Sequence, residues 1–151
     1  MTLPNIADRT IDQTQNWLHR LQDDIGLADE NQAYVALRAV LHQTRDRLPT
    51  DEATDLGAQL PTLVRGIYYE AWKPTATPEK ERHAETFVER VRERMHDHPQ
   101  IDAEAATRSV FALLAAELDS GEIDEVIHMM HDEIKPLWPS EAVERSKARK
   151  N

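Results

Sequence analysis

The sequence predicts an all-α fold, a bundle of about eight helices, and three observations support this prediction. Apolar residues recur at the 3.6-residue spacing of amphipathic helices through most of the 151-residue chain. No stretch rich in β-branched residues alternates apolar and polar positions over the length of a strand. Only four glycines are present, which fits long uninterrupted helices.

Apolar stripes and helix stop signals divide the chain into eight predicted helices. Gly26 ends the first helix, Pro49 ends the second, and Pro61 separates the third from the fourth. A linker of small polar residues, 73–77, precedes Pro78 and is predicted to be extended. The predicted helices cover residues 8–25, 32–47, 50–60, 60–72, 78–96, 102–118, 122–130 and 131–138.

Short polar side chains stand where helix N-caps are needed. Asp8 precedes the first helix, Asp29 or Asn31 the second, and Asp102 the sixth. We therefore expect residues 1–7 to form a short arm. The predicted single domain covers residues 1–139, followed by a charged tail or frayed helix at residues 140–151.

The second half of the chain repeats the buried pattern of the first at a constant offset of 70 residues. Trp17 corresponds to Phe87 and Leu41 to Phe111, and the agreement continues without a gap. Two unrelated helical halves would drift out of register. The pattern therefore predicts two four-helix halves, about residues 8–72 and 78–138, which pack about a pseudo-twofold axis or stack in tandem.

Composition excludes several classes of function. The chain has 28 acidic and 18 basic residues, a net charge of −10, and an anionic surface repels both nucleic acid and anionic lipid. The acidity fits either simple solubility or a salty cytoplasm. The absence of cysteine excludes disulfides and thiol catalysis and fits a cytoplasmic location. No apolar run reaches the length of a signal peptide or a membrane span, so no membrane contact is expected.

The segment from Leu60 to Trp72 is the most distinctive in the chain. It places arginine and aromatic residues together, and the repeat adds Trp138 as the counterpart of Tyr68. One interpretation is a core helix whose aromatic rings fill space. The other is a half-exposed docking surface, because such residues are enriched at binding hot spots. The candidate binding residues are Arg65, Tyr68, Tyr69, Trp72 and Trp138.

Two arginines occupy equivalent places in the predicted halves. Arg38 and Arg108 lie beside the apolar stripe of the second helix of each half. We expect each to brace the break between the third and fourth helices, where unpaired carbonyl groups favour a cation.

Metal sites and enzymatic chemistry find little support. Two Glu-x-x-His pairs, ending at His96 and His128, place their glutamates away from the apolar face, unlike the ligands of a di-iron bundle. The pair His128 and His131 has the spacing of a zinc site on a helix surface, without a defined third or fourth ligand. No nucleophile motif or phosphate-binding loop is present, so a non-enzymatic role without a cofactor is favoured.

The chain resembles the DUF2267 family of bacterial proteins of unknown function. The motifs that carry the resemblance are Ala36–Leu41, Arg45–Pro49, Gly57–Pro61, Arg65–Trp72 and Leu137–Pro139, and the resemblance covers roughly residues 8–139. It implies an all-helical fold and assigns no activity.

The sequence thus favours a non-enzymatic protein-interaction or regulatory module that acts through the aromatic segment, with a protein partner or as a homodimer. The alternative is a ligand- or metal-binding protein that uses His128 and His131 or a pocket between the halves. Burial of Tyr69 and Trp72 discriminates between these readings, since an interaction surface needs them exposed.

Overall fold

The computed structural model describes residues 3–80 and 82–150, and over these residues the chain is all-helical. None of the helices in this part of the chain is both long and apolar enough to cross a membrane. The α-helices are α1 (Leu3–Ile25), α2 (Glu30–Arg47), α3 (Thr50–Gln59), α4 (Thr62–Tyr69), α5 (Ala84–Arg94), α6 (Ala103–Glu117), α7 (Ser120–His128) and α8 (Ser140–Lys150). Two 3₁₀ turns, η1 (Pro74–Ala76) and η2 (Lys135–Leu137), complete the architecture.

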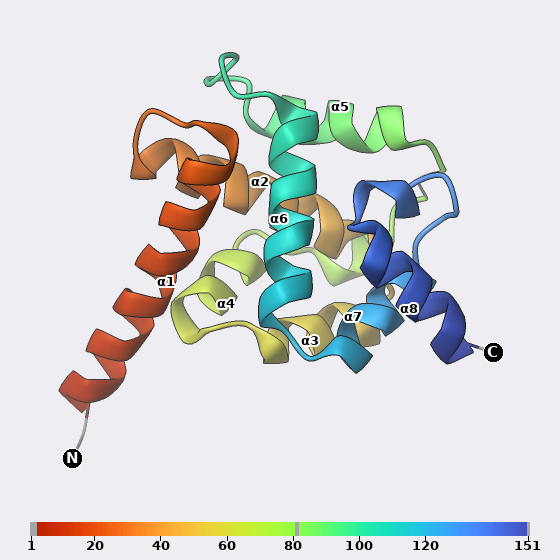
Figure 1. Cartoon of the computed structure of the whole chain (residues 1–151), viewed down its shortest axis with the longest axis horizontal. Coiled ribbons are helices and arrows are strands. Elements are labelled where there is room, and N and C mark those ends of the chain that lie inside the picture. The colour runs from red at the N-terminus through yellow and green to blue at the C-terminus, as the bar shows by residue number, and fades with distance from the viewer. Residues whose placement is uncertain (1–2, 81, 151) are drawn as a thin grey trace.

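Helices α2 and α6 pack against each other at the centre of the molecule (Figure 1). Helix α1 packs against both of them, and so does α5. Helix α3 lies against α7, while α8 contacts α7 and η2. The apolar stripes converge on one continuous core whose largest fully buried side chains include Leu21, Leu37, Leu41, Phe87, Phe111, Leu114 and Ile127.

Local signals set many of the helix ends. The carboxylates of Asp29 and Asp102 accept hydrogen bonds from backbone N–H groups of the first turns of α2 and α6, as the sequence predicts. Asp119 does the same for α7. Gly26 ends α1 with a φ of 67°, and Leu27 donates to the carbonyl of Gln22 at 2.9 Å, the bond of a Schellman motif.

Three predicted helix boundaries are wrong: the start of α1, the end of α4 and the start of α5. Helix α1 starts at Leu3, so Asp8 lies inside it and the expected arm is helical from that residue on; residues 1 and 2 lie outside the described part. Helix α4 stops at Tyr69 rather than Trp72, and Ala71 has a left-handed φ of 58°. Helix α5 starts at Ala84, because Pro78 favours extended backbone before it and Glu79 donates its N–H to the Asp46 carbonyl at 2.8 Å.

The end of the chain also differs from expectation. Residues 131–138 contain only the turn η2, since Pro136 lacks the N–H that a continuing helix needs. Of the two alternatives expected for residues 140–151, a tail or a frayed helix, the helix is observed: α8 is formed, and it is packed, with Ala142 and Ser146 buried. Asn151, at the end of that stretch, lies outside the described residues.

A buried carboxylate on α7 holds α8 in place. The side chain of Asp124 is 0% exposed, and it accepts a hydrogen bond from Arg145 at 3.0 Å and another from Arg149. His128 adds a hydrogen bond from Nε2 to the Ser146 carbonyl at 2.6 Å. The charged face of α8 is therefore paired with the body of the protein, which explains why a segment with few apolar residues is packed.

We predict that Asp124→Asn destabilises the protein, because two guanidinium groups lose the anion that they share. Removing one partner of a fully buried ion pair costs about 3–5 kcal/mol. The arginine side chains are 38% and 50% exposed, so we expect a loss of about 2 kcal/mol of unfolding free energy in urea titrations.

Asp97→Asn is the matched control, since that side chain is 81% exposed. An unchanged urea midpoint for Asp124→Asn would show that the pair does not hold α8.

Candidate functional site

Two of the five predicted binding residues are core residues. Tyr68 is fully buried, and its hydroxyl donates to the Ala53 carbonyl at 2.7 Å; burial is the largest cause that raises the pKa of this phenol. Trp138 is 2% exposed and stacks on Phe111 with ring centroids 4.1 Å apart. Neither ring can receive a partner, so the prediction of a docking surface is wrong for Tyr68 and Trp138.

Tyr69 and Trp72 are half-buried and pack on one another, with ring centroids 5.5 Å apart. Tyr69 also meets Tyr68 edge to face, at 5.0 Å. Gly57 is required beneath them, because a Cβ there would collide with the Tyr69 hydroxyl and crowd the Tyr68 ring. These contacts support the core reading of the aromatic segment over the docking reading.

Arg65 is exposed, yet its guanidinium group makes three hydrogen bonds within the chain. Its Nε and Nη2 atoms donate to the carbonyls of Gly57, Ala58 and Leu60 at 3.0, 3.2 and 3.1 Å. These carbonyls lie at or just past the end of α3, where helical N–H donors become scarce, although Gly57 also accepts from the N–H of Leu60 at 3.1 Å. Arg65 therefore braces the break between the third and fourth helices, the role predicted for Arg38 and Arg108.

Arg38 and Arg108 lie elsewhere. The Nε atom of Arg38 is 3.6 Å from the Glu70 carboxylate, beyond the end of α4. Arg108 donates to the Pro136 carbonyl at 3.0 Å, in η2, and to Glu104 at 3.2 Å. Arg38 reaches the end of α4 and Arg108 reaches η2, rather than the breaks before these segments, because α4 and η2 pack against α2 and α6.

The last turns of α2 bury a polar network that the sequence analysis missed. Arg45 donates to the carbonyls of Tyr68 and Glu70, both at 2.7 Å, and to Asp46 at 2.9 Å. Arg94 of α5 donates to Asp46 at 2.8 Å. The donors and acceptors satisfy one another, so the network acts as a connection between α2, α4 and α5.

A neighbour in this network is held neutral. His42 is 3% exposed and its Nε2 atom lies 2.7 Å from the Ile67 carbonyl. Burial lowers the pKa of His42 to about 4, against the weaker opposing effect of that hydrogen bond. The imidazole is therefore an N–H donor to the end of α4 at neutral pH.

The predicted histidine pair does not converge on a metal position. His128 uses Nε2 to donate to the Ser146 carbonyl, and His131 uses Nδ1 to accept from the N–H of Glu133 at 3.2 Å. Neither residue belongs to a group of three or more potential ligands among the described residues.

Such a group does occur where α3 meets α7. Carboxylate oxygens of Glu52, Asp55 and Glu122 lie within 4.8 Å of one another, and we call these three residues the carboxylate cluster. Glu52 is 9% exposed, and the Oε1 atoms of Glu52 and Glu122 are buried without a hydrogen-bond partner. Its sequence signal is the pair of motifs Glu-x-x-Asp and Glu-x-x-Glu, at residues 52–55 and 122–125, which coincide at the offset of 70.

Burial is the largest cause that raises the pKa values of Glu52 and Glu122, that of Glu122 to about 8. For Glu122 the next causes are a hydrogen bond with Glu52 and the negative charges of Glu52 and Asp55. A hydrogen bond between two carboxyl groups requires a proton on one of them. The two glutamates therefore share a proton near neutral pH unless a cation compensates their charges.

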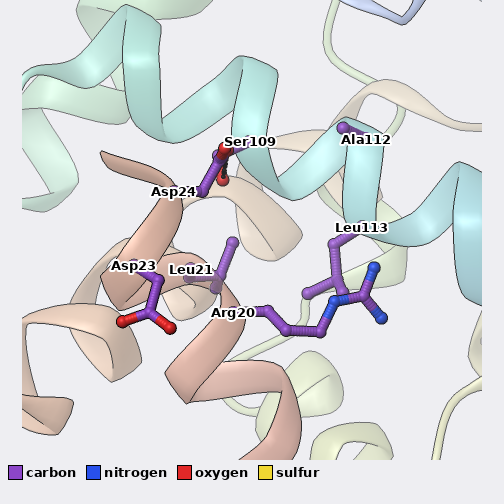
Figure 2. A pocket seen from close by; sticks show the side chains of 7 residues that line it. All are labelled: Arg20, Leu21, Asp23, Asp24, Ser109, Ala112 and Leu113. Atoms are coloured by element: carbon purple, nitrogen blue, oxygen red, sulfur yellow. Dashed lines mark hydrogen bonds between the residues drawn. The ribbon is translucent and has the colours of Figure 1, made fainter. Parts of the chain in front are cut away.

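Two shallow pockets lie between segments of the predicted halves. One of about 410 Å³ separates α1 from α6; Figure 2 shows Asp24 against Ser109, which donates to it at 2.6 Å, and Arg20 extended below Leu113. Asp23 adds a further charge at the α1 side of this pocket. A second pocket, of about 370 Å³, lies between α2 and the end of α5. Its polar lining includes Tyr34, Arg38, Glu70, Arg94, His96 and His98.

Comparison with known proteins identifies a family and no activity. A family model described as "Uncharacterized conserved protein (DUF2267)" matches residues 14–137. This match confirms the resemblance that the sequence motifs indicated. None of the curated proteins compared with the chain matches it.

We predict that Glu122→Gln stabilises the protein at alkaline pH. Because the pKa of Glu122 is about 8 in the folded state and 4.5 ordinarily, the unfolded chain loses this proton first as pH rises. The free energy of unfolding of the wild type therefore falls between about pH 4.5 and pH 8. Glutamine carries no charge at any pH, so we expect its gain in Tm to be near zero at about pH 5 and several degrees at about pH 9.

Glu85→Gln is the control, since Glu85 is an exposed glutamate in the first turn of α5. The groups that face Glu122 are the acidic residues Glu52, Asp55 and Glu125. A gain in Tm that does not change with pH would contradict the shared-proton interpretation.

Proposed function

The chain belongs to the DUF2267 family, whose description assigns no activity, and we propose from its geometry that it is a non-enzymatic interaction module that forms a homodimer. The proposed contact surface consists of the outer half of α1 and the beginning of α4. We call it the outer α1 surface and define it by Ile6, Ile11 and Leu63. The supporting observation is that these apolar side chains are exposed together.

The exposure of these side chains is unusual for their type. Ile6, Ile11 and Leu63 are 51%, 46% and 44% exposed. The N–H of Leu63 donates to the hydroxyl of Thr10 at 2.8 Å, which places the start of α4 against the α1 turn that lies between Ile6 and Ile11. Ile6 and Ile11 lie five residues apart, so they flank this junction on different sides of α1, and Leu63 adds a third exposed apolar side chain beside it. A gathering of exposed apolar side chains marks interaction sites more often than scattered single residues do.

The outer half of α1 stands away from the rest of the protein (Figure 1). Along α1, burial of large apolar side chains begins at Trp17 and continues at Leu18 and Leu21. The apolar face of an amphipathic helix is normally covered by another element. On α1 that face continues outward past Trp17, and α4 covers it only near Thr10.

Charge favours a second copy of this chain as the partner. With a net charge of −10, two copies repel each other over most of their surfaces. The exposed stretch of residues 5–13 contains only Asp8, Arg9 and Asp12 as charged residues. Two copies that meet through this stretch avoid most of the repulsion, and Arg9 of each lies near acidic residues of the other. A twofold arrangement of this kind is the commonest form of oligomer.

The internal repeat supports the same choice of surface. We infer two halves related by a pseudo-twofold axis, because α1 and α5, the first helices of the two predicted halves, each pack against the second helices of both, α2 and α6. Helix α5 begins at Ala84, the counterpart of Thr14 at the offset of 70, and it has 11 residues against the 23 of α1. The outer half of α1 is thus additional to the repeated unit. The family match likewise begins at residue 14, so Ile6 and Ile11 lie before the matched range and Leu63 lies within it.

We predict that the variant Ile6→Glu/Ile11→Glu is a monomer while the wild type is a dimer. The added charges repel across the contact, and Glu preserves the helix because its helix propensity is high. Light scattering after size-exclusion chromatography, over a hundredfold range of protein concentration, measures the mass.

Met129→Glu is the matched control, because Met129 is an equally exposed apolar side chain, at 47%, outside the outer α1 surface. Circular dichroism checks that each variant is folded. A wild type that is monomeric throughout, or a double variant that remains dimeric, would refute the proposal.

A further inference from the structure

The carboxylate cluster combines side chains from two helices that are distant in the sequence. Glu52 and Asp55 lie one turn apart on α3, and Glu122 lies in the first turn of α7. Their ligand oxygens fall within 4.8 Å of one another because α3 packs directly against α7. Glu125, one turn after Glu122, adds a fourth negative charge nearby.

The buried oxygens of this cluster lack compensation by the protein. Glu52 is more than nine-tenths buried, and its Oε1 atom, like Oε1 of Glu122, has no hydrogen-bond donor other than the proton that the two glutamates can share. Buried polar atoms in native proteins are nearly always paired, and an unpaired buried carboxylate is especially costly. This unpaired oxygen is a second observation, independent of the acidic composition, that points to a missing positive partner.

The arginines that pack beside α7 donate to Asp124 and not to the cluster. Arg149 lies beside Gly121 at the start of α7, and both it and Arg145 bond to Asp124. Among the ion pairs of the residues that the structure describes, none involves Glu52, Asp55 or Glu122. A small external cation is therefore the simplest source of positive charge.

We propose that Glu52, Asp55 and Glu122 bind a calcium ion that joins α3 to α7. A donor set made only of carboxylate oxygens suits a hard cation, whereas zinc prefers histidine and cysteine ligands. Two oxygens bound to one Ca²⁺ at about 2.4 Å lie at most about 4.8 Å apart, and the ligand oxygens of the cluster all lie within 4.8 Å of one another. Mg²⁺ demands near-ideal octahedral geometry and dehydrates reluctantly, whereas Ca²⁺ accepts flexible sets of carboxylate oxygens.

The site is expected to be of modest affinity. Three protein ligands leave several of the 6–8 positions around Ca²⁺ to water. A dissociation constant of about 10⁻⁴ M is typical of such partly hydrated sites. Binding replaces the mutual repulsion of the carboxylates by attraction to the ion, so Ca²⁺ should also stabilise the contact between α3 and α7 and raise Tm.

The test is calorimetric titration of the full chain with CaCl₂ in about 150 mM KCl, which screens weak attraction to the acidic surface. We expect about one Ca²⁺ per chain for the wild type, and binding at least tenfold weaker for Glu52→Gln and for Asp55→Asn. Asp55 is exposed, so Asp55→Asn keeps the fold even if Glu52→Gln affects it. Glu85→Gln should bind as the wild type does.

Thermal unfolding in CaCl₂ and in MgCl₂ at equal ionic strength gives a second readout. A rise in Tm with Ca²⁺ that exceeds the rise with Mg²⁺, and that Glu52→Gln abolishes, supports the site. Three results would overturn it: no heat with the wild type, equal binding by Glu52→Gln and Asp55→Asn, or an equal response to both cations. Failure here leaves the homodimer proposal intact, because the outer α1 surface shares no residue with the cluster.

Discussion

The burial of the last turns of α2 is the constraint on which the rest of the fold depends. From His42 to Arg47, six consecutive polar or charged residues are at most 8% exposed. A helix that is buried on all sides must provide partners for every polar group that it carries. Arg45 donates hydrogen bonds to the carbonyls of Tyr68 and Glu70, and Asp46 accepts one from Arg94. Together these contacts fix where α4 and α5 end relative to α2.

Much of the fold follows from the sequence because the signals are local. Apolar periodicity places the buried faces of α2, α5 and α6 correctly. As expected, Gly26 marks the end of α1, and Asp29 and Asp102 mark the starts of α2 and α6. Periodicity fails where burial is polar: it cannot distinguish Arg45 in a closed network from an arginine in solvent. It fails again for α8, whose packing comes from two arginines on one buried aspartate. Both errors have the same cause, since a paired charge can be buried although no hydrophobic pattern records it.

The candidate sites show the same limit more strongly. The aromatic segment is distinctive in sequence, yet Tyr68 fills the core beneath Gly57 and Arg65 braces the end of α3. These residues are distinctive in the sequence because close packing and hydrogen bonding within the fold require them. The carboxylate cluster depends on how α3 packs against α7, which periodicity does not predict. Its sequence signal is the offset of 70 residues between Glu52 and Glu122. Ile6 falls in the expected arm and Ile11 in the apolar stripe predicted for residues 8–25, and periodicity cannot show that Ile11 is 46% exposed.

The cluster also contains an electrostatic conflict. Acidic side chains in the first turn of a helix are favourable, because the helix dipole is positive there, and Glu52 and Glu122 satisfy this preference in α3 and in α7. Packing α3 against α7 brings the two favourable carboxylates together, where burial and mutual repulsion oppose ionisation. A cation bound between the two carboxylates would relieve this conflict without removing either charge, and Asp55 beside them offers a third oxygen. The geometry of the cluster, rather than its acidity alone, is therefore what supports a binding site.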